Sequence, residues 1–355
     1  HPPKADMIFL SGPLCARAHL NSMSFWDGKK VLVTGGAGFV GSHLTERLVT
    51  SGADVGVVVA DDFSRGEQAN IADVMESIKV DAADLEKAAD CGRICKGNDV
   101  VFHLAARVGG VGHNVKHPAT MFRRNLRMSS YMLEAATKAG VERFCVVSSA
   151  CVYRRDCTIP TPENEGFVDW PEETNVGYGW AKRMAEFEAY AVNREFGLEI
   201  AIARPYNAYG PRDHFDPVNG HVIGSLIRRV LEGENPLKVW GDGRQTRAFL
   251  YVEDFVRGLM EVTESYAECD PVNLGSDEEV TIKELAEIVV ELSGLKTRIE
   301  FDPSKPSGQP RRNCDSRKAR EKFGFTAEVP LREGLRRTID WYRKNNEAKL
   351  DTSHV

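Results

Sequence analysis

Three features are scarce in this 355-residue chain, and each scarcity excludes a class of protein. No apolar run approaches the roughly 18 residues needed to cross a bilayer, so no membrane-spanning segment is predicted. The formal net charge is -6, which gives no overall positive field for nucleic acid. The eight cysteines lack paired CxxC spacing, which argues against a metal site or a disulfide framework and favours a reducing, cytoplasmic setting.

The bulk composition is that of an ordinary globular protein, with 42% apolar and 28% charged residues. The chain exceeds the roughly 250 to 300 residues at which a single core stops growing, so we expect a large domain with an added lobe. Residues 1–28 are expected to be an extension outside the fold, either artificial or a loose native segment. Met23 is a candidate native start within it.

Apolar, β-branched runs alternate with helical patterns between residues 29 and 205. The runs are KKVLVT, DVGVVVAD, SIKVDAAD, NDVVFHLAA, RFCVVSS and LEIAIARP. Near-continuous apolar strands separated by helices are typical of a parallel sheet that is covered on both faces. The sequence therefore predicts an α/β fold with a doubly wound, Rossmann-type parallel sheet over residues 29–205.

The alternation breaks after Pro205, where Gly and Pro cluster in YNAYGPRDHFDPVNG. We expect a smaller α/β lobe from residues 206–247 and 276–350, with residues 248–275 returning to the first domain. Helices are predicted in HVIGSLIRRVLEG and LREGLRRTIDWYRKNN. A further helix should begin after Thr281, because Thr281 and Glu284 form a capping box before an apolar stripe.

A glycine-rich stretch, TGGAGFVG, follows the first predicted strand and precedes a helix. Gly35, Gly38 and Gly41 would let the backbone turn tightly and approach a pyrophosphate at the helix N-terminus. Asp61 ends the second strand about 20 residues later, where a carboxylate can bind the adenosine ribose. This spacing predicts NAD binding and disfavours NADP, because a carboxylate repels a 2′-phosphate, although Arg65 nearby could attract one. The alternatives are an ordinary strand-to-helix turn for the glycines and a solvated turn for Asp61 and Asp62.

Two further motifs carry polar side chains suited to catalysis. SSAC follows the strand RFCVV, so Ser149 and Cys151 should face the carboxyl edge of the sheet, where doubly wound folds bind ligands. In YGWAK, Tyr178 and Lys182 are four residues apart and share a helix face. Using the phenol as a base near pH 7 requires lowering its pKa by about 3 units from 10, which a lysine and a cationic nicotinamide could together supply.

Together, TGGAGFVG, Asp61, HLAA, Ser149 and the Tyr178/Lys182 pair resemble the extended short-chain dehydrogenase/reductases that act on nucleotide sugars. The resemblance covers about residues 29 to 347. It implies that Ser149 and Tyr178 hydrogen-bond the sugar 4-hydroxyl, that Tyr178 takes its proton with help from Lys182, and that the C4 hydride moves to the nicotinamide.

Cys151 narrows the resemblance. GDP-L-fucose synthases and GDP-mannose 3,5-epimerases, which this stretch resembles, carry a cysteine at this position that moves protons at C3 and C5. In UDP-sugar 4-epimerases the same position looks like a threonine. His221 in NGHVI resembles the histidine that serves as the partner acid in the fucose synthases. In the 3,5-epimerases a lysine takes this position. Beside a C4 ketone, inversion needs removal of a proton on one face and delivery on the other. The alternatives are a small buried apolar residue for Cys151 and a helix-capping residue for His221.

The resemblance also implies the remaining contacts. Guanidinium groups suit bidentate phosphate binding, which makes Arg229 and Arg247 candidates for the diphosphate. The expected cofactor-binding residues are Gly35, Gly38, Phe39, Val40, Gly41, Asp61, Asp62, Asp84, Leu104, Ala105, Ala106, Tyr178 and Lys182. The expected substrate-binding residues are Val108, Gly109, Gly110, Asn207, His221, Val222, Arg229, Trp240, Arg247 and Arg312.

These observations favour a GDP-hexose epimerase that works through a 4-keto intermediate at C3 and/or C5 and recycles a tightly bound NAD. The alternatives are a GDP-L-fucose-synthase-type epimerase/reductase, a UDP-hexose 4-epimerase, and a non-catalytic NAD-sensing regulator. The resemblance further implies a homodimer with a four-helix interface around residues 117–139 and 178–196.

Overall fold

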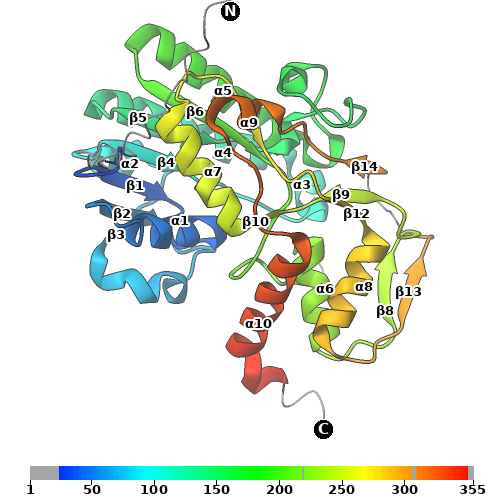
Figure 1. The fold of residues 1–355 in the computed structure, drawn as a ribbon. Coiled ribbons are helices and arrows are strands. Elements are labelled where there is room, and N and C mark those ends of the chain that lie inside the picture. Colours follow the sequence, from blue (N-terminus) through cyan, green and yellow to red (C-terminus); the bar gives the residue numbers. More distant parts are fainter. Residues whose placement is uncertain (1–23, 218–219, 306–308, 351–355) are drawn as a thin grey trace, which may run out of the picture.

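The computed structural model describes residues 24–217, 220–305 and 309–350, and a parallel sheet forms its core (Figure 1). The strand order is β11-β6-β5-β4-β1-β2-β3, and all neighbouring strands in this sheet run parallel. The order reverses at β1, so this is the predicted doubly wound fold, whose ligands bind at the carboxyl ends near the reversal. The strands are β1 (Lys30–Thr34), β2 (Gly56–Asp61), β3 (Ile78–Ala82), β4 (Val100–His103), β5 (Arg143–Val147), β6 (Glu199–Pro205) and β11 (Val272–Leu274).

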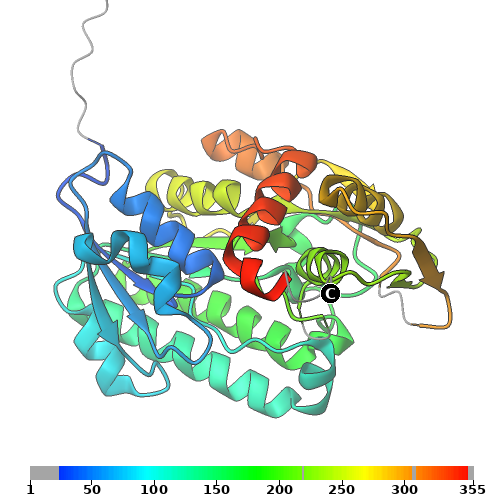
Figure 2. The same cartoon turned by 90° about the horizontal axis from the view of Figure 1, so that it is seen from below.

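Helices cover both faces of this sheet (Figure 2). On one face α1 (Phe39–Val49) contacts α7 (Val252–Ser265); on the other α4 (Pro118–Ala139) lies between α2 (Ala88–Cys95) and α5 (Val176–Phe196). Alternate residues of β1 feed the two layers, because Val31 packs with the α1 and α7 side chains and Leu32 with those of α2, α4 and α5. Burial on both faces explains why these strands read as unbroken apolar runs.

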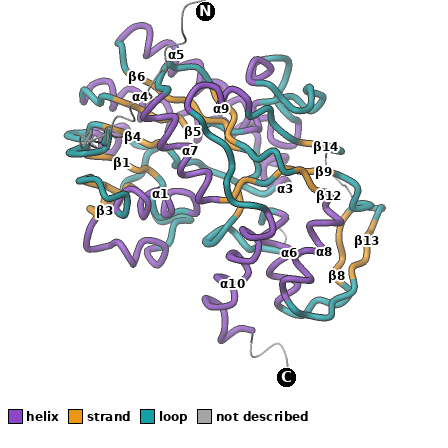
Figure 3. The backbone as a smooth tube through the Cα atoms, in the orientation of Figure 1, coloured by secondary structure: helices purple, strands orange, loops and turns teal. Residues whose placement is uncertain are grey.

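The second group of elements follows β6 and lies beside the sheet (Figures 1 and 3). Helices α6, α8 and α10 contact one another there. Its elements are β7 (Ala208–Tyr209), α6 (Val222–Leu231), β8 (Leu237–Trp240), β9 (Thr246–Ala248), β10 (Leu250–Tyr251), β12 (Glu279–Thr281), α8 (Ile282–Ser293), β13 (Ile299–Asp302), β14 (Arg311–Arg312) and α10 (Leu331–Leu350). Helix α9 (Arg317–Phe323) instead packs on β11 and α7 of the main sheet. The remaining helices are the α-helix α3 (Val111–Lys116) and the 3₁₀ helices η1 (Gln68–Ser77), η2 (Ala150–Val152), η3 (Glu163–Phe167) and η4 (Glu173–Asn175). The boundaries proposed for two lobes stay a prediction.

The predicted capping box is confirmed at α8. The Thr281 hydroxyl accepts a hydrogen bond from the Glu284 amide, and the Glu284 carboxylate accepts one from the Thr281 amide. The helices predicted after His221 and from Leu331 are also present. None of the helices in the described ranges is long and apolar enough to span a bilayer.

The structure differs from the sequence prediction in two places. The seventh strand, β11, has only three residues, which is too short for an apolar run to reveal it. Residues 1–23 of the expected extension lie outside the described residues. Residues 24–28 are described, and Trp26 among them is buried. Its ring stacks on Phe102 of β4, and its indole N–H donates to Glu264 at 3.0 Å. Residues 24–28 therefore belong to the fold.

Candidate active site

The glycine stretch forms a tight loop between β1 and α1. Gly35 has φ +67°, and a Cβ on Gly41 would lie 2.1 Å from the Gly35 carbonyl oxygen. Only a glycine at 41 lets the first turn of α1 close on this loop. Gly38 caps α1 without any side-chain hydrogen bond, so amide groups of the first turn stay available to an anion. The loop therefore fits a pyrophosphate.

Asp61 fixes this loop from the end of β2. Its side-chain oxygens accept hydrogen bonds from the amides of Ala37 at 3.0 Å and Phe63 at 2.9 Å. Burial raises the pKa of Asp61, and the two amides oppose that rise. Each carboxylate oxygen accepts more than one hydrogen bond, so the group can still bind ribose hydroxyls.

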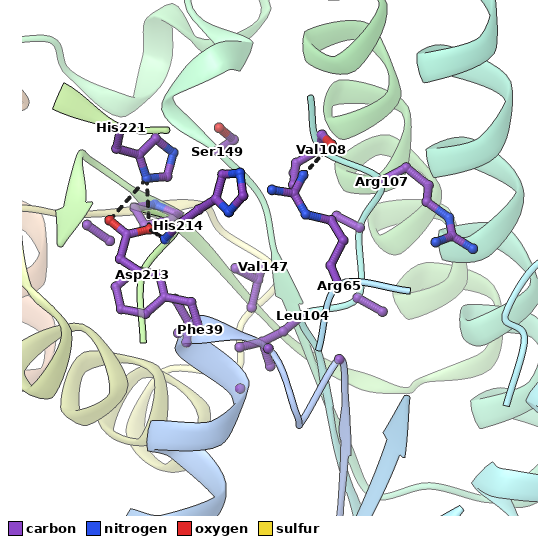
Figure 4. Close-up of a pocket in the computed structure, with 18 of the residues that line it drawn as sticks. Phe39, Arg65, Leu104, Arg107, Val108, Val147, Ser149, Asp213, His214 and His221 are labelled. Carbon is purple, nitrogen blue, oxygen red and sulfur yellow. Dashed lines mark hydrogen bonds and ion pairs between the residues drawn. The ribbon is translucent and has the colours of Figure 1, made fainter. Parts of the chain in front are cut away.

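Two arginines, Arg65 and Arg107, line the same cleft as this carboxylate (Figure 4). Arg65 donates to the Val108 carbonyl at 2.6 Å. Arg107 pairs with Asp62 at 2.5 Å, and Asp62 also accepts from the Ser64 hydroxyl at 2.6 Å. Asp62 is thus held by protein groups, and Asp61 is the more buried of the two carboxylates.

Ser149 and Cys151 follow β5 into the cleft, as the sequence predicts. Ser149 caps the short helix η2, and its hydroxyl oxygen accepts a hydrogen bond from the Cys151 amide at 3.1 Å. A Cβ on Gly179 would lie 2.4 Å from the Cys151 carbonyl oxygen. The glycine after Tyr178 therefore allows α5 to approach the end of β5 closely and brings the two motifs together.

Tyr178 and Lys182 lie one turn apart on α5. Lys182 Nζ donates to the Val147 carbonyl at 2.8 Å and lies 5.5 Å from the centre of the Tyr178 ring. Burial lowers the pKa of Lys182 to about 8 and raises the pKa of Tyr178 above its ordinary value of 10. Burial therefore outweighs the lysine in the protein alone, and a phenolate needs further positive charge from a ligand.

A buried polar network beneath these residues was not predicted. Arg204 and Glu186 form an ion pair at 2.6 Å, with side chains 2% and 1% exposed. Glu186 also accepts from the Ser148 hydroxyl, and Arg204 donates to the Tyr153 hydroxyl at 3.0 Å. The network ties α5 to the ends of β5 and β6. The available signal was a single arginine, Arg204, in the apolar run IAIARP. No sequence rule pairs it with Glu186, which lies on α5 four residues after Lys182.

His221 lies at the mouth of the same cleft and caps α6 (Figure 4). Its Nδ1 is 3.1 Å and 3.3 Å from the two carboxylate oxygens of Asp213. The attraction of Asp213 raises the pKa of His221. Sequence reasoning named neither Asp213 nor His214, whose ring also lines the cleft, because a loop gives no periodic signal.

Two predicted arginines meet across the small sheet. Arg312 of β14 and Arg247 of β9 are register partners in parallel strands. Burial, followed by the charge of Arg312, lowers the pKa of Arg247 to about 10. Neither guanidinium has a carboxylate within ion-pair distance among the described residues. Two adjacent unpaired cations favour an anionic ligand. Arg312 also lies beside Cys151. Burial lowers the pKa of Arg312, but the neighbouring Cys151 opposes this effect, and the pKa is raised overall.

The structure gathers most of the predicted residues around one cleft of about 720 Å³. Its lining includes Gly35, Gly38, Phe39, Val40, Gly41, Asp61, Asp62, Leu104, Ala105, Ala106, Val108, Gly109, Gly110, Ser149, Cys151, Tyr178, Lys182, Asn207, His221, Val222 and Arg312.

Four predicted residues do not line this cleft, namely Asp84, Arg229, Trp240 and Arg247. Asp84 accepts a hydrogen bond from the Glu86 amide at 3.1 Å, while its neighbours Ala83 and Leu85 line the cleft. Arg229 donates to Glu234 at 2.7 Å, so its charge is already paired. Trp240 is 60% exposed at the end of β8.

Comparisons with known proteins agree on one family. Residues 31–275 match the model of the NAD dependent epimerase/dehydratase family. The chain is 32% identical to GDP-mannose 3,5-epimerase of Arabidopsis thaliana over 93% of this chain and 87% of that protein. It is 35% identical to probable GDP-L-fucose synthase 1 of Oryza sativa subsp. japonica over 90% and 93%. UDP-glucose 4-epimerase of Thermotoga maritima, solved with UDP-glucose, superposes with a TM-score of 0.80 at 32% identity, covering 89% of this chain and 99% of that one.

Proposed function

This chain belongs to the NAD dependent epimerase/dehydratase family of extended short-chain dehydrogenase/reductases, and on that premise we propose that it is a GDP-hexose epimerase. It acts through a 4-keto intermediate with inversion at C3 and/or C5. The observation that carries the proposal is that Cys151 and His221 line the same cleft as Ser149, Tyr178 and Lys182. A thiol and an imidazole there add proton transfer to a site otherwise suited to oxidation at C4.

The coenzyme of the proposal is a retained NAD, held by the Gly35–Gly41 loop at its pyrophosphate and by Asp61 at its adenosine ribose. Bound NAD would accept a hydride from C4 of the hexose and return it at the end of the turnover. The tight loop, which closes because Gly41 has no Cβ, and the buried carboxylate of Asp61 support this fit. A carboxylate at that place would repel the 2′-phosphate of NADP.

Oxidation at C4 uses the residues that follow β5 and those in the first two turns of α5. Tyr178 takes the proton of the 4-hydroxyl, and the Ser149 hydroxyl donates a hydrogen bond to the oxygen as it becomes a carbonyl. Lys182 holds positive charge near the phenol, anchored by its hydrogen bond to the Val147 carbonyl. The ketone makes the protons at C3 and C5 acidic.

Inversion then requires two proton-carrying groups. Cys151 takes a proton from C3 or C5, and His221 delivers one to the opposite face of the ring. Unperturbed thiols and imidazoles titrate at about 8.5 and 6.5, near enough to neutral pH to exchange protons. Arg312, which lines the cleft, and Arg247, its register partner, are proposed to bind the diphosphate, and their lack of ion-pair partners among the described residues supports this. Arg229 is the weaker candidate, because its guanidinium is already paired with Glu234.

A GDP-L-fucose-synthase-type reaction is the second candidate, and His221 favours it. The synthases resemble this chain in having a histidine where the 3,5-epimerases have a lysine. In that reaction a supplied 4-keto-6-deoxy sugar is epimerised and then reduced, so coenzyme is consumed. A UDP-hexose 4-epimerase would need only Ser149, Tyr178 and Lys182, and would leave Cys151 and His221 without a role.

Incubation with GDP-mannose in deuterated water separates these reactions. Without added coenzyme, NMR should show deuterium at C3 or C5 of the recovered sugar, and no label should enter UDP-glucose. Label that enters only a 4-keto-6-deoxy sugar, with net loss of added coenzyme, would favour the second candidate. Absence of label in every GDP-sugar would remove both, and interconversion at C4 of UDP-glucose would favour the 4-epimerase.

We also propose a cytoplasmic homodimer. The supporting features are large apolar side chains left exposed on α5, where Phe187 is 58% and Tyr190 47% exposed. α5 packs along α4, so a second copy would complete a four-helix interface. The cysteines among the described residues are all unpaired, which suits a reducing compartment.

A further inference from the structure

Asp213 is a buried carboxylate whose charged partner is His221. Its side chain is 3% exposed, whereas that of His221 is 69% exposed. The carboxylate oxygens lie 3.1 Å and 3.3 Å from His221 Nδ1, and one of them also accepts a hydrogen bond from the His214 amide at 2.7 Å. No lysine or arginine pairs with Asp213 within the described part of the chain, since Arg212 turns away to Glu46 at 2.9 Å.

This geometry fixes which nitrogen of the imidazole faces the ligand. Asp213 can only accept, so the Nδ1 atom of His221 carries a hydrogen that points at the carboxylate. The Nε2 atom lies on the other side of the ring from Asp213, and His221 lines the same cleft as Ser149 (Figure 4). A buried carboxylate without a cation is costly, so the pair also favours the imidazolium form.

The groups around His221 otherwise oppose its positive charge. His221 is the first residue before α6, and the N-terminus of a helix disfavours a cation. Arg65, across the cleft, lowers the pKa of His221. Asp213 is the group that reverses this balance, because its attraction is the largest influence on the imidazole.

We propose that Asp213 is a positioning residue that orients His221 and keeps it protonated as the proton donor of the C3/C5 inversion. The proposal rests on the proposed function for the donor role. In the step, a carbon–hydrogen bond breaks and the Cys151 thiolate gains that proton, while His221 Nε2–H breaks and its proton forms the new carbon–hydrogen bond. Both groups then return to their starting states by proton exchange with water, which is what introduces deuterium.

The first test does not depend on activity. The full-length protein with ¹⁵N-labelled histidine is titrated by NMR, and His221→Asn identifies the His221 signals. The wild type should show an imidazole pKa above 6.5 and a hydrogen on Nδ1 in the neutral ring. Asp213→Asn keeps the shape but removes the charge, and should lower that pKa by about one unit or more. Glu232→Gln, which removes an exposed carboxylate at the far end of α6, should leave it unchanged.

The second test measures the pH dependence of deuterium entry at C3 and C5. The donor must be protonated, so exchange falls as pH rises through the His221 pKa, and Asp213→Asn should move this fall to lower pH. The C4 oxidation step, followed as NADH absorbance, should keep its rate. Asp213→Glu, which keeps the charge, should retain the raised pKa even if Asp213→Ala fails to fold.

The two failures are distinguishable. An unchanged His221 pKa in Asp213→Asn, or a neutral ring protonated on Nε2 in the wild type, would overturn the role of Asp213. Absence of exchange in the wild type with every nucleotide sugar would overturn the donor role together with the proposed function, whatever the titration shows.

Discussion

The coenzyme side of the cleft is made by residues that are close in sequence, whereas the sugar side gathers residues from distant segments. Gly35, Gly41 and Asp61 belong to one β-α-β unit. The loop closes through a backbone hydrogen bond from the Gly38 amide to the Gly35 carbonyl and through the Ala37 amide, which donates to the Asp61 carboxylate. Cys151, His221 and Arg312 come from the ends of different strands and helices. The first side is therefore set by local geometry, and the second depends on how separate elements pack.

The two sides also differ in how their charges are satisfied. Asp61 already accepts hydrogen bonds from two backbone amides. On the sugar side, Arg247 and Arg312 are adjacent without carboxylate partners in the described ranges. Protein groups thus hold the coenzyme side ready, and a ligand must complete the electrostatics of the sugar side.

The largest effect is expected on the coenzyme side, from Gly41→Ala. The added Cβ would lie 2.1 Å from the Gly35 carbonyl oxygen, so the loop must open. We expect NAD binding, measured by calorimetry, to be lost and the melting temperature to fall. Gly92→Ala is the control: it adds a methyl group to α2 in open space and should be neutral or stabilising by up to about 1 kcal/mol. Unchanged NAD affinity in Gly41→Ala would contradict the pyrophosphate role of the loop.

The next largest effect is expected where the two sides meet, from Tyr178→Phe. Removal of the proton acceptor should slow C4 oxidation, measured as NADH absorbance with a GDP-hexose, by about 10²- to 10⁴-fold. Nucleotide-sugar affinity should change little. Tyr266→Phe removes a buried hydroxyl that bonds Asp270 at 2.7 Å, away from the cleft, and serves as the control. Equal losses in both variants would indicate general destabilisation in place of a catalytic role.

A smaller effect is expected on the sugar side, from Arg312→Gln. A hydrogen bond to a charged group contributes about 1.5–3 kcal/mol, so KM for the GDP-hexose should rise about 10- to 100-fold. The rate of C4 oxidation at saturation should stay near that of the wild type. Arg311→Gln is a matched neighbour, because Arg311 is 53% exposed and pairs with Glu279 at 2.8 Å. A KM change of the same size at Arg311 would sink the phosphate role of Arg312.

The signals for the coenzyme side are local, so the sequence alone brings its proposed residues into one β-α-β unit. Glycines between a strand and a helix, and a carboxylate at the next strand end, appear in the order in which they act. Tyr178 and Lys182 share a helix face for the same reason. The sheet was predicted from its long strands, but β11 has three residues and leaves no such trace.

The sugar side was harder to predict because it depends on tertiary packing. Nothing in the sequence shows that β14 pairs with β9 and brings Arg312 beside Arg247. The pairing of Arg229 with Glu234 follows from a turn after α6, and it weakens the case for that arginine as a phosphate ligand. Asp213 also lies in an irregular loop, where neither helical nor strand periodicity marks a buried side chain.

The central claim is that a thiol and an imidazole carry out proton transfer in a cleft that also oxidises C4. The most direct measurement compares Cys151→Ser with the wild type in deuterated water, following NADH absorbance and label at C3 and C5 together. We predict that Cys151→Ser retains NADH formation and loses label incorporation by about 10²-fold or more. If Cys151→Ser incorporates as much deuterium as the wild type, the account is contradicted.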